Sequence, residues 1–72
     1  MITKDQIKTE LFEDVRIIKS ENEIEEIVFV LNSKLDLTFR MRFDGIRVNS
    51  FVNIDQFDEI IRVRKELLKW KE

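Results

Sequence analysis

Hydrophobic and polar residues alternate most regularly between residues 35 and 52. From residue 35 to residue 43 every second residue is apolar and the residues between them are polar, the pattern of a strand with one buried face. Asp44-Gly45 follows directly, and a two-residue Asp-Gly loop favours a type I′ turn. Pairing Phe43 with Ile46 across this turn places the apolar residues of both strands on one face. The pattern therefore predicts a β-hairpin over residues 35–52.

Two further strands are predicted before this hairpin. Residues 15–19 form a short β-branched run, and residues 24–31 are apolar enough on both faces to form an interior strand. A two-residue loop at Ser33-Lys34 places Val30 on the apolar face of the hairpin and leaves Phe29 on the opposite face. A three-residue loop reverses these two faces, and the sequence leaves that choice open.

Helical spacing of apolar residues is confined to the two ends of the chain. Thr3 and Gln6 have the spacing of a capping box, which predicts a short helix over residues 4–12. Near the C-terminus the pattern predicts an amphipathic helix of about 16 residues with Asp55 as its N-cap. Glu59 lies in the first turns, where the helix dipole favours acids. The apolar positions of this helix are Phe57, Ile60, Ile61, Val63, Leu67, Leu68 and Trp70.

These elements predict a single α+β domain over residues 1–72. Its expected architecture is a four-stranded antiparallel β-meander with a short N-terminal helix and a long C-terminal amphipathic helix packed on the sheet, in the order α-β-β-β-β-α. The C-terminal helix covers one face of the sheet. The N-terminal helix lies beside it or covers part of the second face; a second face that stays uncovered is a surface for another chain.

Composition excludes several classes of function. The chain has no cysteine, histidine or tyrosine, which removes the usual zinc ligands and most general bases and nucleophiles. The acidic residues between Glu21 and Glu26 lack the spacing of a calcium loop. We therefore expect no enzyme, no cofactor and no metal site. Because the sequence also has no signal-peptide core and no apolar run of membrane-spanning length, we expect a cytoplasmic protein with no membrane partner.

The outward face of the predicted hairpin is the best candidate for a binding surface. In the expected register Arg42 lies beside Arg47 and Arg40 beside Asn49, while the second sheet face adds apolar residues of the preceding strand. Arginine and aromatic residues are enriched in protein interfaces. A simpler interpretation is that Glu25 or Glu26 on the neighbouring strand pairs with these arginines. The predicted partner-binding residues are Arg40, Arg42, Arg47, Asn49, Phe51 and Phe29.

We interpret the chain as a small non-catalytic module that binds another protein, including a second copy of itself as a homo-oligomer. Residue usage rich in Ile, Lys, Glu and Asn is typical of A+T-rich bacterial or phage genomes, where a small inhibitor or adaptor of a host protein fits. The alternative is a nucleic-acid-binding regulator, in which the arginines hold phosphates and Phe51 stacks on a base. The net charge of −2 favours a protein partner over nucleic acid.

Overall fold

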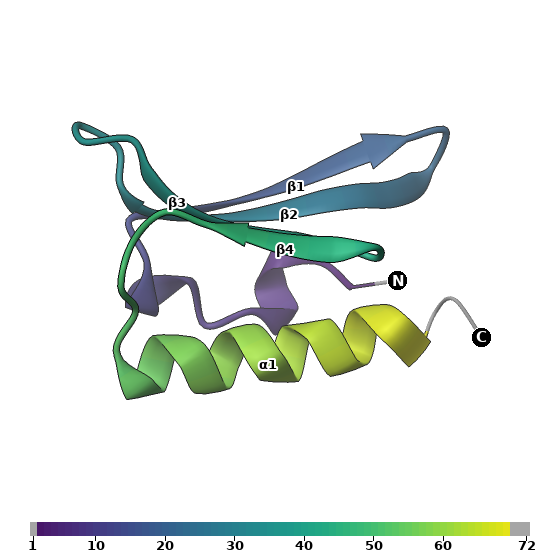
Figure 1. Ribbon diagram of the computed structural model, residues 1–72. Helices are drawn as coiled ribbons and strands as arrows, with labels where there is room; N and C mark the ends of the chain where they lie inside the picture. Colours follow the sequence, from purple (N-terminus) through teal and green to yellow (C-terminus); the bar gives the residue numbers. More distant parts are fainter. Residues whose placement is uncertain (1, 70–72) are drawn as a thin grey trace.

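A four-stranded antiparallel sheet forms the centre of the computed structural model, which describes residues 2–69. The strands follow one another in the sheet in chain order: β1 (Asp14–Ser20), β2 (Glu23–Asn32), β3 (Leu37–Arg42) and β4 (Gly45–Val48). The helix α1 (Ile54–Lys69) and two short 3₁₀ helices, η1 (Lys4–Gln6) and η2 (Thr9–Leu11), lie on the same side of the sheet (Figure 1). The α+β class, the antiparallel meander and the long C-terminal helix are confirmed.

The hydrophobic core lies between the sheet and α1. Phe29 is at its centre, with ring centroids 4.9 Å from Phe12 and 6.3 Å from Phe39. Ile60 and Leu67 of α1 are buried in the same cluster, and each such side chain contributes about 1.5–3 kcal/mol to stability. Trp70, predicted on the apolar face of this helix, lies outside the described residues.

The face of β2 that contacts α1 is the reverse of the one expected from a two-residue loop. Phe29 pairs with Phe39 and therefore faces the core, while Val30 faces away from α1. Residues 33–36 form the loop, and Asp36 adopts a φ of 54° at its end. The two-residue loop at Ser33-Lys34 is therefore wrong, and the reversed faces that the sequence left open are the ones observed.

The hairpin of β3 and β4 forms, but it turns one residue earlier than predicted. Arg42 pairs with Gly45, so Phe43-Asp44 is the two-residue loop. Gly45 belongs to β4 and does not have a positive φ, so the type I′ turn at Asp44-Gly45 is wrong. The new pairing places Arg40 opposite Arg47 and differs from the expected register by an even number of residues. Each side chain therefore stays on its predicted face.

The N-terminal helix predicted over residues 4–12 is replaced by η1 and η2. Between them Ile7 is extended, with φ −113° and ψ 138°, and its side chain is buried in the core. The N–H of Lys8 donates to Oε2 of Glu59 at 2.7 Å instead of to a carbonyl within a helix. So short a helix is marginal by itself, and here tertiary contacts decide the backbone conformation.

Reciprocal side-chain contacts still mark the start of the helical segments. Thr3 N–H donates to Oε1 of Gln6 at 2.9 Å, as the predicted capping box requires. At the start of α1, Gln56 N–H donates to Oδ1 of Asn53 at 2.8 Å and Asn53 N–H donates to Oε1 of Gln56 at 3.0 Å. Asn53 is therefore the N-cap of α1, and the prediction of Asp55 in that position is wrong.

Candidate functional site

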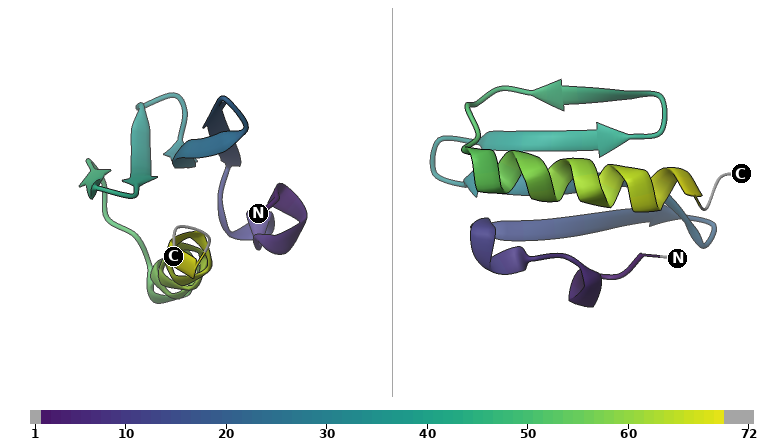
Figure 2. Two further views of the ribbon diagram at one scale, coloured as in Figure 1. Left: turned by 90° about the vertical axis from the view of Figure 1, so that its right-hand side faces the viewer. Right: turned by 90° about the horizontal axis from the view of Figure 1, so that it is seen from below.

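The face of the sheet that points away from α1 is covered by no helix among residues 2–69 (Figure 1, Figure 2). The N-terminal segment lies on the α1 side and does not extend to this face. We call this surface the open face. The strand pairing places on it Asp14, Arg16, Ile18, Glu26, Val28, Val30, Thr38, Arg40, Arg42 and Arg47.

Arginines from three strands form a row across the open face. Arg16 is paired with Val28, Val28 with Arg40, and Arg40 with Arg47. Val28 is only 3% exposed although no helix covers it. We attribute this burial to the aliphatic stems of the arginines on either side, which can cover apolar surface while their guanidinium groups stay in water. The row thus presents positive charge above a small apolar floor.

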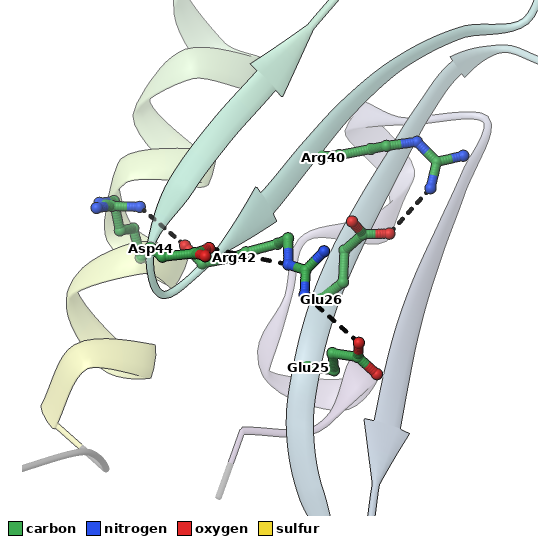
Figure 3. A network of polar contacts seen from close by, with 6 residues as sticks. Glu25, Glu26, Arg40, Arg42 and Asp44 are labelled. Carbon is green, nitrogen blue, oxygen red and sulfur yellow. Dashed lines mark hydrogen bonds and ion pairs between the residues drawn. The ribbon is translucent and has the colours of Figure 1, made fainter.

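Two arginines of the open face, Arg40 in the row and Arg42 beside it, are held by carboxylates of the neighbouring strand, as Figure 3 shows. An Nη1 of Arg40 lies 2.9 Å from Oε1 of Glu26, and an Nη2 of Arg42 lies 3.4 Å from Oε1 of Glu25. The Nε of Arg42 also lies 3.8 Å from Oδ1 of Asp44. The pairing of these arginines with Glu25 and Glu26 is confirmed. Each such surface pair contributes at most about 1 kcal/mol, so its main effect is to orient the guanidinium group.

Arg47 differs from its neighbours because its side chain forms no ion pair or hydrogen bond with any residue of the described chain, 2–69. It borders a hollow of about 180 Å³ that is also lined by Glu26, Arg40, Arg42 and Gly45. Gly45 adds no side chain to the hollow. Three arginines against one glutamate give the lining a positive balance, which suits a carboxylate or phosphate group bound by two guanidinium N–H groups.

Positive charge is weaker at the β1 edge of the open face. Asp14 accepts a hydrogen bond from Nε of Arg16 at 3.2 Å and from the N–H of Val15 at 2.9 Å. These two hydrogen bonds, with Lys4 at 3.7 Å, hold the pKa of Asp14 below its usual value, so this carboxylate stays charged and neutralises Arg16. The unpaired positive charge is therefore concentrated at the β3–β4 end.

The structure brings together only part of the predicted binding set. Arg40, Arg42 and Arg47 lie together on the open face. Asn49 follows β4, where its Oδ1 accepts from Thr38 N–H at 2.8 Å and its Nδ2 donates to the carbonyl of residue 36 at 3.0 Å. Its side chain thus extends the contact between β3 and the chain after β4, and the expected pairing of Arg40 with Asn49 is wrong.

The two aromatic residues of the predicted set lie elsewhere. Phe51 is fully exposed, but it belongs to the segment between β4 and α1 and not to the sheet. Phe29 is fully buried in the core, so its predicted position on the second face is wrong. Sequence reasoning missed Arg16 and Val28. The alternation of polar and apolar residues in the first strand was the available signal, but the face of the second strand depended on the unknown loop length.

Comparison of the chain with protein-family models, with curated proteins and with solved structures finds no match. Within residues 2–69, no three residues of the types Asp, Glu, His or Cys gather closely enough to bind a metal ion. No helix in the same part of the chain combines the length and the apolar character needed to cross a membrane. The function must therefore be argued from the open face itself.

Proposed function

We propose that this protein is a cytoplasmic, non-catalytic module that binds an acidic surface of another protein through its open face. A protein with this function would act as a small inhibitor or adaptor of a host protein, of the kind that phages and other mobile elements encode. The observation that carries the proposal is the gathering of Arg40, Arg42 and Arg47 around a hollow, on a sheet face that none of the described elements covers. A carboxylate of the partner would enter that hollow beside Arg47.

Two features of the open face favour tight binding over loose attraction. Because Glu26 and Glu25 already orient Arg40 and Arg42, less side-chain entropy is lost when a partner binds. Ile18 is partly exposed on the same face and adds apolar area beside the charges. Arginine next to apolar surface, with few lysines, is the composition typical of the centre of a protein interface.

Binding of nucleic acid by the same arginines is the second candidate function, favoured by the row of guanidinium groups across the sheet. It is less well supported because the net charge of the protein is −2, which disfavours approach to a polyanion. The fully exposed Phe51 also lies outside the sheet, so it is not placed to stack on a base held by the row.

Charge reversal at Arg47, compared with the same reversal at Lys65, tests the proposal. Arg47 has no described internal partner, so Arg47→Glu should leave the fold intact; Lys65 is exposed on α1 and likewise forms no described ion pair. Affinity capture from bacterial lysate should retain the same proteins with the wild type and with Lys65→Glu. The Arg47→Glu protein should lose them by about tenfold or more.

Two results would contradict this function. Equal capture by the wild type and Arg47→Glu would show that the open face is not the binding surface. Binding of mixed-sequence oligonucleotides with a steep dependence on salt, measured by fluorescence anisotropy, would favour the nucleic-acid function instead.

A further inference from the structure

A second surface, separate from the hollow on the open face, lies at the edge formed by β4. β4 is the last strand of the sheet, and α1 passes beneath the middle of the sheet and leaves β4 to one side (Figure 2). Ile46 and Val48 lie on the same face of the sheet as the buried residues Met41 and Phe39, with which they pair. They nevertheless remain 45% and 48% exposed, because no described element packs under β4.

The backbone of β4 has hydrogen-bonding groups that no neighbouring strand uses. Asn49 N–H donates to the carbonyl of Thr38 at 3.3 Å, so position 49 faces β3. In an antiparallel pair, successive residues alternate between facing the partner strand and facing away from it. Arg47 therefore faces β3, whereas Ile46 and Val48 each direct one N–H and one C=O outward. A strand placed along this edge would find donors and acceptors at the right spacing.

One flank of α1 continues the apolar surface under this edge. Arg64 donates to the carbonyl of Arg42 at 3.4 Å, which shows that the flank containing Arg64 faces the β3–β4 hairpin. Phe57 and Leu68 lie on the same flank by helical spacing, and both are partly exposed. We call these four apolar residues the β4 ledge: Ile46, Val48, Phe57 and Leu68.

We propose that the β4 edge binds an extended segment of another protein as a fifth strand, in which apolar residues alternate with acidic ones. Outward backbone groups of Ile46 and Val48 would form the ladder. Alternate apolar side chains would pack on the β4 ledge, and the acidic side chains between them would lie beside Arg47 on the opposite face. This inference goes beyond the proposed function, since it requires backbone pairing and not the hollow.

Charge complementarity decides between this occupant and a second copy of the chain. In an antiparallel pair of β4 strands that uses these outward groups, Ile46 of one copy pairs with Val48 of the other, which places Arg47 directly opposite Arg47 of the other copy. Like charges in direct cross-strand contact are destabilising, whereas a glutamate or aspartate in that position forms an ion pair with an arginine that otherwise has no described partner. The edge thus fits an acidic strand better than it fits itself.

Amide hydrogen exchange of the whole protein, followed by NMR, tests the proposal. The probe is a capped peptide of about ten residues in which valine alternates with glutamate, and the control peptide has lysine in place of glutamate. We expect the glutamate peptide to slow exchange at Ile46 and Val48 by about tenfold or more, and the lysine peptide to have no such effect.

Two variants separate the backbone contribution from the side-chain contribution. Val48→Pro removes an N–H that points outward and spares the β3–β4 ladder, so it should abolish the protection at Ile46. Ile46→Lys keeps the backbone intact and removes apolar surface from the β4 ledge, so it should weaken binding of the peptide by about tenfold. If Val48→Pro fails to fold, the second variant still provides the test.

Three results would overturn the inference. If the peptide perturbs only Arg40, Arg42 and Arg47 without slowing exchange at Ile46 and Val48, it binds at the hollow. That result would support the proposed function and contradict the binding of a fifth strand at the β4 edge. Equal binding of the lysine peptide would remove the argument from charge. Protection of the edge that grows with protein concentration in the absence of peptide would assign the edge to a second copy of the chain.

Discussion

The two flanks of α1 contact the rest of the protein in opposite ways. On one flank Gln56, Glu59 and Arg62 each exchange a hydrogen bond with the backbone of the N-terminal segment. On the other flank Phe57 and Leu68 remain partly exposed beside β4. The first flank finds polar partners within its own chain, whereas the second presents apolar area with no described partner. The comparison indicates which side of the helix completes the fold and which side is available for binding.

Glu59 is the residue on which the polar flank depends. It is only 3% exposed, and its carboxylate accepts hydrogen bonds from Arg62 at 2.6 and 2.8 Å and from Lys8 N–H at 2.7 Å. The hydrogen bonds from Arg62 hold the pKa of Glu59 below its usual value even though burial acts in the other direction. The same contact raises the pKa of Arg62. A buried carboxylate with this many donors is a structural anchor.

The largest effect is expected from Glu59→Ala. The substitution leaves Lys8 N–H without its acceptor and Arg62 without its ion pair, which should lower the free energy of unfolding by about 2–3 kcal/mol. Urea unfolding followed by circular dichroism measures the change. Asp58→Ala is the matched control, since Asp58 is an exposed carboxylate one position away and should cost no more than about 0.5 kcal/mol. Equal losses in the two variants would contradict the role given to Glu59.

Acidification should remove part of the same stabilisation. Because the pKa of Glu59 is lower in the folded protein than its ordinary value of 4.5, its contribution is complete above that value and is lost as the pH falls through the folded pKa. The urea midpoint of the wild type should therefore fall more steeply below about pH 4.5 than that of Glu59→Gln. Asp14 titrates in the same direction in both proteins, so it does not affect the difference. If the urea midpoints of the wild type and Glu59→Gln change with pH in the same way, the acid-sensitive stabilisation does not come from Glu59.

A smaller loss is expected at the β4 side from Asn49→Ala. This substitution removes the acceptor for Thr38 N–H and the donor to the carbonyl of residue 36. We expect the free energy of unfolding to fall by about 1 kcal/mol, measured by urea unfolding. Asn49→Asp keeps the acceptor and loses the donor, so its free energy of unfolding should lie between those of the wild type and Asn49→Ala. If Asn49→Ala is neutral, the side chain is free for binding and its structural role is wrong.

The smallest effect is expected from Leu68→Glu on the apolar flank. Because Leu68 is partly exposed and lies at the edge of the core, stability should change by no more than about 0.5 kcal/mol. Lys65→Gln, on the exposed side of α1, provides the reference for lowering the charge of this helix by one unit, as Leu68→Glu does. A loss above about 1 kcal/mol would place Leu68 inside the core and would reduce the β4 ledge.

The strands could be predicted from the sequence because period-two alternation tolerates certain errors. The turn of the hairpin moved from Asp44-Gly45 to Phe43-Asp44, yet the even shift in register kept Arg40 and Arg47 on the same face. The prediction for β2 did not tolerate such an error, because a change of one residue in the loop reverses the two faces of the strand. It depended on the length of the loop over residues 33–36, which local sequence does not determine when no strong turn motif is present.

The N-terminal segment could not be predicted because its conformation depends on contacts with distant residues. Thr3 and Gln6 do form a capping contact, but Lys8 N–H is bound by Glu59 and the chain cannot continue as a helix. Glu59 itself resembles an ordinary acid near the start of a helix, so no local pattern distinguishes it from Asp58. The binding arginines were predictable individually, but the hollow beside Arg47 depends on the observed register.

The hydrogen bonds on the polar flank join residues that are 45, 51 and 56 positions apart in the chain. During translation the ribosome therefore releases the N-terminal segment well before its acceptors and donors on α1 exist. The β-meander needs only nearer neighbours and can pair in the meantime. We therefore expect the N-terminal segment to reach its final position only after α1 has formed, although it precedes α1 in the chain.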